Sequence, residues 1–129
     1  MNQKPLDPAG HISLAVSNLE KSKKFYKSLF NQLGFKEIKD TAWVTREGFG
    51  IWIRQAKQAK QPHKHFAPGL HHLCVKAKSK NLVDEIYHQM LAKEAFIFAE
   101  PKSYPAFTPK YYATSFADPD GIKIEIAYY

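Results

Sequence analysis

The amino-acid sequence predicts an α+β fold made of two tandem βαβββ modules, which form a curved mixed sheet, or cup, with the helices on its outer face. Three observations lead to this prediction. A strand-like segment at 11–16 is repeated at 72–77, each copy is followed by a helical pattern, and each helix is followed by short strands. Such an internal repeat indicates a duplicated supersecondary unit.

The two repeated segments have the pattern of half-buried β-strands. Residues 11–16 read His-Ile-Ser-Leu-Ala-Val, and residues 72–77 read His-Leu-Cys-Val-Lys-Ala. In both, larger apolar residues alternate with smaller or polar ones, which is the period of a strand with one face on a core. The apolar face is expected to pack on the helices, so the opposite face looks toward water, a cavity or a partner.

A helix is predicted after each of these strands. The first follows the polar pair Ser17-Asn18 and carries apolar side chains three or four residues apart until Gly34 ends it. The second is capped by Ser79 and shows the same spacing as far as Leu91. Both helices therefore have one apolar face to lay on a sheet.

Short strands are predicted after each helix. They lie at about 35–39, 41–45 and 50–55 in the first module, and at about 95–99, 111–117 and 122–128 in the second. Gly48 and Gly121 mark the tight turns before the last strands. When these turns are aligned, Trp52 corresponds to Glu125. The offset between the two modules is then 61 residues at the first strands and 73 residues at the last strands. The additional residues fall in the Pro- and Tyr-rich segment 100–110, which is expected to be a long lid or binding loop.

The length and composition indicate a single domain spanning 1–129. Module one is placed at about 10–55, a polar linker at about 56–69, and module two at about 70–128. The sequence is 44% hydrophobic and 14% aromatic, as expected for a globular protein with a core. No apolar run approaches the roughly 20 residues of a membrane helix, and no signal peptide is recognised. The single cysteine excludes an internal disulfide and favours a cytoplasmic location.

The formal net charge of +7 does not by itself indicate a nucleic-acid partner. The lysines are scattered along the chain, and the sequence contains neither a basic helix of the groove-reading type nor an aromatic-basic RNA motif. The charge is therefore interpreted as a solvated surface, with a nucleic-acid accessory role as the weaker interpretation. We expect neither a nucleic acid nor a membrane as partner.

A candidate metal site lies on the sheet face opposite the helices. His11 and His72 occupy equivalent positions of the repeat, and Glu125 lies at a third position that the repeat defines. Two imidazoles and one carboxylate suit a divalent ion such as Fe, Mn, Ni or Zn, and they leave coordination positions open, as catalysis requires. Cys74 shares this face and is interpreted as a buried, unreactive thiol.

Three stretches of the sequence resemble the vicinal oxygen chelate superfamily, which includes glyoxalase I, bleomycin- and fosfomycin-resistance proteins and extradiol dioxygenases. They are 11–26 with 33–35, 69–75, and 116–125, and the last, which contains Asp-Pro-Asp-Gly, is the most specific. The resemblance covers about residues 10–127. It implies metal ligands on the first and fourth strands of each module, at His11, Trp52, His72 and Glu125. An indole cannot bind a metal, because it offers only an N–H donor, so Trp52 is expected to form an aromatic wall.

The resemblance implies a glyoxalase-like metalloenzyme, in which a divalent metal chelates vicinal oxygens of a small oxygen-rich substrate. Lyase, isomerase, transferase and dioxygenase chemistry all remain open, although the missing carboxylate at Trp52 argues against glyoxalase I proper. A homodimer is also implied. The expected substrate-binding residues are Trp52, Arg54, Tyr112 and Ser13, and Arg54 is the one suited to an anionic group. The alternative is a metal-free protein that sequesters a small molecule, as the bleomycin-resistance branch does.

Overall fold

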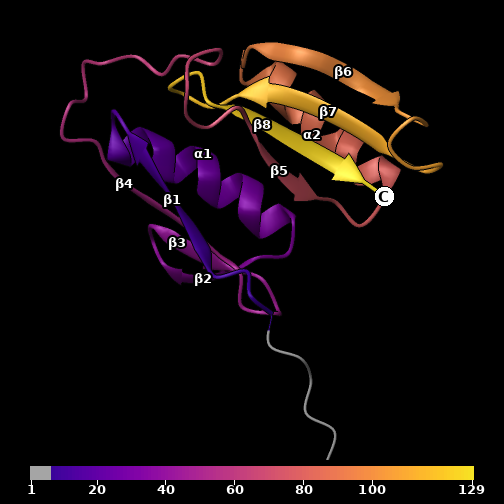
Figure 1. The fold of residues 1–129 in the computed structure, drawn as a ribbon, viewed down its shortest axis with the longest axis horizontal. Helices are drawn as coiled ribbons and strands as arrows, with labels where there is room; N and C mark the ends of the chain where they lie inside the picture. The colour runs from indigo at the N-terminus through magenta and orange to yellow at the C-terminus, as the bar shows by residue number, and fades with distance from the viewer. Residues whose placement is uncertain (1–6) are drawn as a thin grey trace, which may run out of the picture. The chain divides into compact units, whose positions relative to one another are not determined.

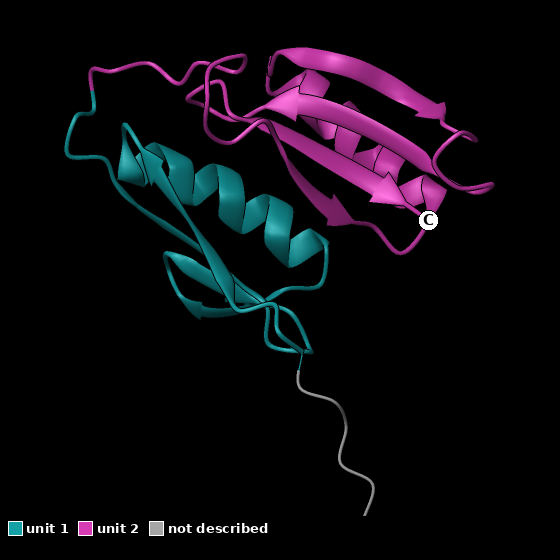
Figure 2. Ribbon diagram, in the orientation of Figure 1, with its two compact units in different colours: residues 1–59 teal, residues 60–129 magenta. Residues whose placement is uncertain are grey.

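The computed structural model describes residues 7–129, and the chain divides into two compact units between Ala59 and Lys60 (Figure 2). This boundary lies in the segment that was expected to be a linker. Each unit is one βαβββ module with a four-stranded mixed sheet and one helix (Figure 1). The predicted fold class of two α+β modules is therefore confirmed. That both modules make one domain stays a prediction.

The first unit places its helix against an aromatic core. Its elements are β1 (His11–Val16), α1 (Leu19–Gln32), β2 (Lys36–Lys39), β3 (Ala42–Val44) and β4 (Gly50–Gln55). The strand order is β1-β4-β3-β2, with β1 parallel to β4 and the other pairs antiparallel. Tyr26 and Phe30 of α1 and Trp43 of β3 are fully buried. The Phe30 and Trp43 rings lie 5.3 Å apart and meet edge to face, a favourable aromatic geometry.

The second unit repeats this topology around an aliphatic core. Its elements are β5 (Leu73–Lys76), α2 (Lys80–Ala92), β6 (Ile97–Ser103), β7 (Tyr112–Ala117) and β8 (Lys123–Tyr128). The strand order is β5-β8-β7-β6, with β5 parallel to β8. α2 packs on β6, β7 and β8, where Ile86 of the helix and Ile124 and Ile126 of β8 are fully buried. Burying such side chains is the main stabilising contribution to the fold.

The two sheets have the same strand register. Ser13 of β1 lies opposite Trp52 of β4, and Cys74 of β5 lies opposite Glu125 of β8. These pairs are related by the repeat offsets read from the sequence, 61 residues for the first strand and 73 for the last. Trp52 and Glu125 therefore occupy equivalent places in the two modules, as the alignment of the turns predicted.

The turns before β4 and β8 are also built alike. Gly48 and Gly121 have positive φ angles of 99° and 85°, which favour glycine because a Cβ is disfavoured there. In the first turn, Thr45 Oγ1 accepts the backbone N–H four residues later at 3.0 Å. In the second turn, Asp118 Oδ1 accepts the backbone N–H of Ile122, also four residues later, at 2.8 Å. Side-chain acceptors thus fix both turns and with them the start of each last strand.

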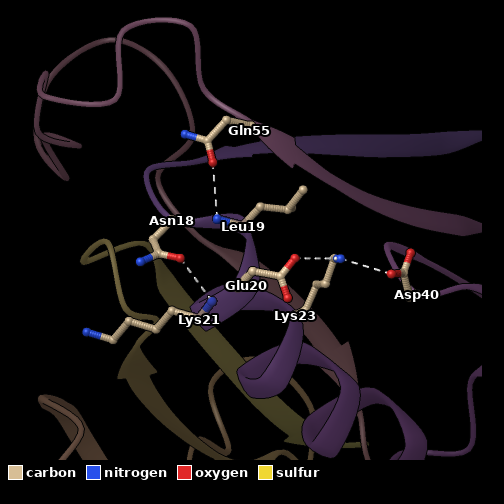
Figure 3. A network of polar contacts seen from close by, with 7 residues as sticks. All are labelled: Asn18, Leu19, Glu20, Lys21, Lys23, Asp40 and Gln55. Carbon is tan, nitrogen blue, oxygen red and sulfur yellow. Dashed lines mark hydrogen bonds and ion pairs between the residues drawn. The ribbon is translucent and has the colours of Figure 1, made fainter.

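Both helices begin at the predicted caps. Asn18 Oδ1 accepts the N–H of Lys21 at 3.1 Å, and Ser79 Oγ accepts that of Leu82 at the same distance. Such caps satisfy backbone donors that the first turn leaves unpaired. Gln55, the last residue of β4, also accepts from the α1 backbone at 3.1 Å (Figure 3). This contact fixes the end of the strand that carries Trp52 against the start of the helix.

An ion-pair network joins α1 to the turn between β2 and β3. Lys23 Nζ lies 2.9 Å from Glu20 and 2.9 Å from Asp40 (Figure 3). The two acidic side chains are largely exposed, so solvent screens these pairs and they add little to stability. The two carboxylates raise the pKa of Lys23, mainly through their hydrogen bonds, first from Asp40 and then from Glu20.

The segment expected to be a loop from residue 100 is partly a strand. β6 runs from Ile97 to Ser103, so the prediction of a loop over 100–110 is wrong for its first residues. Pro101 is tolerated because β6 is an edge strand, and the pairing with β7 shifts register between Ala99 and Lys102. The connection to β7 is therefore 104–111. Within residues 7–129, neither helix is long and apolar enough to cross a membrane.

Candidate metal and substrate site

His72 and Glu125 meet on adjacent strands of the second unit. His72 directly precedes β5, and Glu125 lies in β8, the strand that pairs with β5. His72 Nε2 is 3.1 Å from Glu125 Oε1, with 34% and 17% of the two side chains exposed. An imidazole nitrogen and a carboxylate oxygen thus converge at a partly buried, accessible place. Two of the three predicted metal ligands are brought together there.

Two neighbouring side chains hold this pair in position. The Tyr111 hydroxyl donates a hydrogen bond to Glu125 Oε2, the carboxylate oxygen that does not face His72. His71 Nδ1 lies 2.7 Å from His72 Nδ1. Desolvation and the Glu125 hydrogen bond raise the pKa of Tyr111, so the hydroxyl stays protonated and remains a donor at neutral pH. Both side chains of the pair therefore have a hydrogen-bond partner on the side away from each other, as metal ligands commonly do.

The contact between His71 Nδ1 and His72 Nδ1 links the protonation of the two rings. Two ring nitrogens can share a hydrogen bond only if one is protonated and the other is not. Desolvation lowers the pKa of His71, with nearby positive charges adding to the effect, so this ring is neutral at pH 7. When His72 Nδ1 donates to His71, its Nε2 offers a lone pair beside the Glu125 carboxylate. This donor set fits a divalent ion.

Cys74 lies opposite Glu125 on the neighbouring strand but is not buried. The residue is exposed on β5, so the prediction of a buried thiol is wrong. The residues of β5 alternate, and Cys74 falls on the same face as the paired Glu125. The pKa of its thiol is raised to about 11, because desolvation of the sulfur and the Glu125 carboxylate both disfavour the thiolate. The thiol is therefore protonated at neutral pH, and its lack of reactivity stays a prediction.

A pocket of about 250 Å³ opens beside the pair and lies wholly within the second unit. Its wall combines apolar and aromatic side chains with polar and charged ones. The lining residues are His72, Phe98, Ala99, Tyr104, Phe107, Ala113, Thr114, Ser115, Lys123 and Glu125. Apolar surface combined with convergent polar groups is typical of small-molecule sites. His72 and Glu125 therefore face a space in which a small ligand can bind.

The first unit presents a different set of side chains at the equivalent positions. The His11 ring lies 6.5 Å from the Trp52 indole, and Arg54 Nε donates to Ser13 Oγ at 2.7 Å. A Cβ at Gly50 would lie 3.2 Å from the indole nitrogen, so a glycine there leaves room for the Trp52 ring. Because side chains alternate along a strand, His11, Ser13, Trp52 and Arg54 share one face of this sheet, as predicted from the sequence.

Comparison with known proteins identifies the family. Residues 9–126 match the Glyoxalase/Bleomycin resistance protein/Dioxygenase superfamily. The chain belongs to this superfamily. An uncharacterized protein of Bacillus subtilis, YqjT, is 34% identical over 122 residues, which is 90% of this chain and 94% of that protein. The family that the sequence resemblance implied is therefore confirmed.

Solved structures of the superfamily have the same fold. A glyoxalase/bleomycin resistance protein from Albidiferax ferrireducens is 26% identical, with a TM-score of 0.71 over 93% of this chain and 98% of that one. A glyoxalase/dioxygenase from Nostoc punctiforme is 19% identical, with a TM-score of 0.73 over 99% and 98% of the two chains. At the lower identity the likeness concerns the fold alone.

The superfamily's third expected ligand, His11, lies in the first unit, apart in the sequence from His72 and Glu125. Within either unit, residues 7–129 contain no group of three or more His, Cys, Asp or Glu side chains placed to hold a metal ion. The second unit by itself supplies only two of the three expected ligands, His72 and Glu125. The assignment of His11 as a ligand thus stays a prediction.

Tyr111 and Tyr112 have different roles in this superfamily member. Tyr112 was expected to contact substrate, but its hydroxyl donates to Asp84 Oδ1 of α2 at 2.6 Å. This hydrogen bond raises the pKa of Tyr112 to about 12. Tyr111, one residue earlier, is the tyrosine that reaches Glu125. A substrate contact of Tyr112 stays a prediction, and it would have to involve the ring or require loss of the Asp84 bond.

Sequence reasoning did not assign Lys123, Phe107 or His71 to the site. Lys123 could have been found, because it lies two residues before Glu125 and alternation places both on one sheet face. His71 directly precedes His72, and the two rings are hydrogen-bonded partners. Phe107 lies in an irregular loop, where no periodicity indicates which side chains face a pocket.

Proposed function

We propose that this chain is a metal-dependent enzyme of the superfamily, in which His72, Glu125 and His11 bind one divalent ion, Fe, Mn, Ni or Zn. The observation that carries the proposal is the 3.1 Å approach of His72 Nε2 and Glu125 Oε1 at the wall of a pocket. When bound, such an ion withdraws electron density from two neighbouring substrate oxygens and stabilises developing negative charge. The substrate is therefore a small molecule with vicinal oxygens.

The side chains of the pair and its neighbours have distinct tasks in this proposal. Tyr111 holds the Glu125 carboxylate from the side away from His72, and His71 fixes the orientation of the His72 ring. Because both partners are positioned before a ligand arrives, little conformational entropy is lost on binding. We assign no proton transfer to a particular residue, and lyase, isomerase, transferase and dioxygenase chemistry all fit the proposed site.

Side chains of the first unit are proposed to contact substrate. Trp52 stands where the second module has Glu125, so it offers an aromatic surface in place of a carboxylate. This substitution argues against glyoxalase I chemistry. Ser13 accepts the Arg54 Nε donor at 2.7 Å, which orients the guanidinium and directs its terminal N–H groups to other acceptors. A guanidinium held in this way suits an anionic oxygen.

A metal-free binding protein, which sequesters a small molecule, is the second candidate. Two observations favour it. Within either unit the described residues provide no three-ligand group, and at 3.1 Å His72 Nε2 and Glu125 Oε1 are close enough to pair directly with each other. The aromatic wall of the pocket would serve sequestration as well as catalysis. The two candidates differ in one measurable property, namely whether a divalent ion binds.

Metal content and thermal stability distinguish these candidates. We expect protein purified without chelator to carry a divalent ion, and we expect Mn, Fe, Ni or Zn to raise the Tm of chelator-treated protein, since a ligand that binds only the folded state stabilises it. His72→Ala and Glu125→Gln should abolish this rise. His88→Ala and Glu85→Gln, which change exposed residues of α2, are the matched controls and should retain it.

The same experiment can overturn the proposal. If the wild-type protein contains no metal and none of the four ions raises its Tm, the metal-dependent function is wrong and the binding protein remains. Because His72→Ala or Glu125→Gln could simply unfold the chain, each variant is first compared with the wild type by circular dichroism in the presence of chelator. An unchanged spectrum then assigns any loss of metal binding to the site itself.

We also propose that the protein is a cytoplasmic homodimer. The single exposed cysteine, Cys74, suits a reducing compartment, and the family resemblance favours a dimer. Size-exclusion chromatography with light scattering should give twice the 14.8 kDa mass of one chain. A mass equal to that of one chain would contradict the proposed assembly without affecting the metal site.

A further inference from the structure

One wall of the pocket is an exposed aromatic ring that is nevertheless fixed in place. Phe107 is 66% exposed, which is unusual for a large apolar side chain in a pocket wall. Its ring stacks on Tyr104 with centroids 5.6 Å apart and an interplanar angle of 17°. The edge of Tyr111 meets it at 5.2 Å. A solvated apolar surface that is held rigid in this way is prepared to bind a flat apolar partner.

The backbone of the connecting loop keeps this wall in place. Tyr104 N donates to Tyr111 O at 2.9 Å, which closes the loop at its base, and Phe107 N donates to Tyr104 O at 3.0 Å. The loop therefore has internal hydrogen bonds and does not depend on a ligand to order it. Binding to a pre-organised wall loses less entropy than binding to a mobile one.

A single ammonium group faces the same pocket. Lys123 Nζ lies 5.3 Å from the centroid of the Phe98 ring, another wall residue. Lys123 makes no ion pair with any carboxylate of residues 7–129. An ammonium in an aromatic-lined pocket attracts an anionic group, while Glu125 in the same pocket repels a second negative charge. The pocket therefore favours a ligand whose negative group lies next to Lys123 and away from Glu125.

From these features we propose that the pocket binds an aromatic acid, a single planar ring that carries one carboxylate with an oxygen on the neighbouring carbon. The ring packs on Phe107 and Phe98, and the carboxylate lies next to Lys123. The volume of about 250 Å³ is below the roughly 300–1,000 Å³ of drug-sized ligand sites, and this size favours one ring. The neighbouring oxygen rests on the proposed function, since it supplies the second oxygen for the metal.

Salicylate is a suitable probe, because it has one ring, one carboxylate and a neighbouring hydroxyl. We expect isothermal titration calorimetry to detect its binding to the full chain, with chelator present or with Zn added. Cyclohexanecarboxylate, which has the charge without the planar ring, and phenol, which has the ring without the charge, should each bind at least about tenfold more weakly. These two comparators separate the aromatic contribution from the charge.

Two variants with matched controls locate the binding. Phe107→Ala and Lys123→Met should each weaken salicylate binding by about tenfold. Phe66→Ala removes a ring that is 92% exposed and does not line the pocket. Lys80→Met removes an ammonium that lies over the Tyr112 ring at 5.6 Å, also away from the pocket. Both control variants should bind salicylate like the wild type. Because Phe107 is exposed, its replacement is expected to leave the fold intact. Phe107→Leu provides a second measurement, and it should weaken salicylate binding by half as much as Phe107→Ala or less.

The outcomes separate this inference from the proposed function. No salicylate binding with or without Zn, or equal binding of cyclohexanecarboxylate, would overturn the substrate class even if the metal test succeeds. Binding that Phe107→Ala leaves unchanged would also overturn it. If salicylate binds as expected in chelator while no metal raises the Tm, the aromatic-acid pocket stands and the metal-dependent function fails.

Discussion

The two modules share a backbone plan but differ in the side chains at equivalent places. In the first module the His11 ring lies beside the indole of Trp52, and in the second the His72 ring lies beside the carboxylate of Glu125. The strand register around both pairs is the same. The comparison shows that duplication provides two equivalent positions, and that these positions carry side chains of different chemistry, an indole in one module and a carboxylate in the other.

The connection between the second and third strands also differs. The first module joins β2 to β3 through the two residues 40–41, whereas the second joins β6 to β7 through residues 104–111. The longer connection provides Tyr104, Phe107 and Tyr111, which lie around the pocket and the Glu125 carboxylate. The second module therefore holds both the ligand pair and the binding wall, and the following predictions test this asymmetry.

The largest effect is expected from removing the Tyr111 hydroxyl. Tyr111→Phe leaves the ring contacts with Phe107 in place but frees one oxygen of Glu125, so affinity for Zn should fall by about 10–100-fold, as is typical when the hydrogen-bond partner of a metal ligand is removed. Competition with a chromogenic chelator measures this. Tyr112→Phe is the control, because its hydroxyl binds Asp84 instead. Equal losses in both variants would contradict a specific role for Tyr111.

A second prediction makes the first module resemble the second. Trp52→Glu places a carboxylate at the position equivalent to Glu125, so a site that includes His11 should gain a fourth ligand and bind Zn about tenfold more tightly than the uncharged Trp52→Gln variant, a difference of about 1.4 kcal/mol. The same chelator competition applies. Identical affinities of the Glu and Gln variants would show that the first module does not contribute to the site.

A smaller effect tests whether the helices of the two modules start in the same way. Asn18→Ala and Ser79→Ala each remove a cap that accepts a backbone N–H at 3.1 Å, so each should lower the free energy of unfolding by about 1 kcal/mol. Urea denaturation followed by circular dichroism measures the change. The exposed helix residue Ser28, replaced by Ala, serves as a control and should not destabilise the chain. A much larger loss for one cap would indicate that the two helices are not stabilised alike.

The smallest effect concerns alkaline pH. Hydrogen bonding to Asp84 raises the pKa of Tyr112 from 10.0 to about 12 in the folded chain. The stabilisation by this tyrosine is therefore complete below about pH 10 and is lost as the pH rises through about 12. Tyr112→Phe should have a lower Tm at pH 8 but a shallower decline in Tm between pH 10 and 12 than the wild type. Parallel declines in the two proteins would rule out this linkage.

Most of the fold could be predicted because it depends on periodic patterns. The alternation at 11–16 identified β1 and its two faces, and the caps Asn18 and Ser79 marked both helix starts. The offset between the Gly48 and Gly121 turns predicted the equivalence of Trp52 and Glu125, which the strand register confirms. The extension of β6 was missed, since a proline normally argues against a strand and only its edge position makes Pro101 acceptable.

The details of the site were less predictable because they depend on side-chain contacts without a period. Sequence spacing could not show that Tyr111, rather than Tyr112, reaches Glu125, since the two differ by one residue at the end of an irregular loop. Nor could it show that His71 and His72 share a hydrogen bond through their Nδ1 atoms. Such contacts depend on side-chain rotamers and on loop geometry, which a sequence pattern does not specify.

The central claim is that His72 and Glu125 of the second module bind a divalent metal with His11. An anomalous difference map at the zinc edge, from a crystal of the protein grown with Zn, tests it most directly. We predict one peak about 2.0–2.2 Å from His72 Nε2, a Glu125 carboxylate oxygen and a ring nitrogen of His11, distances typical of zinc ligands. A map without a peak at the His72–Glu125 pair, or with zinc bound only elsewhere on the chain, would contradict the account.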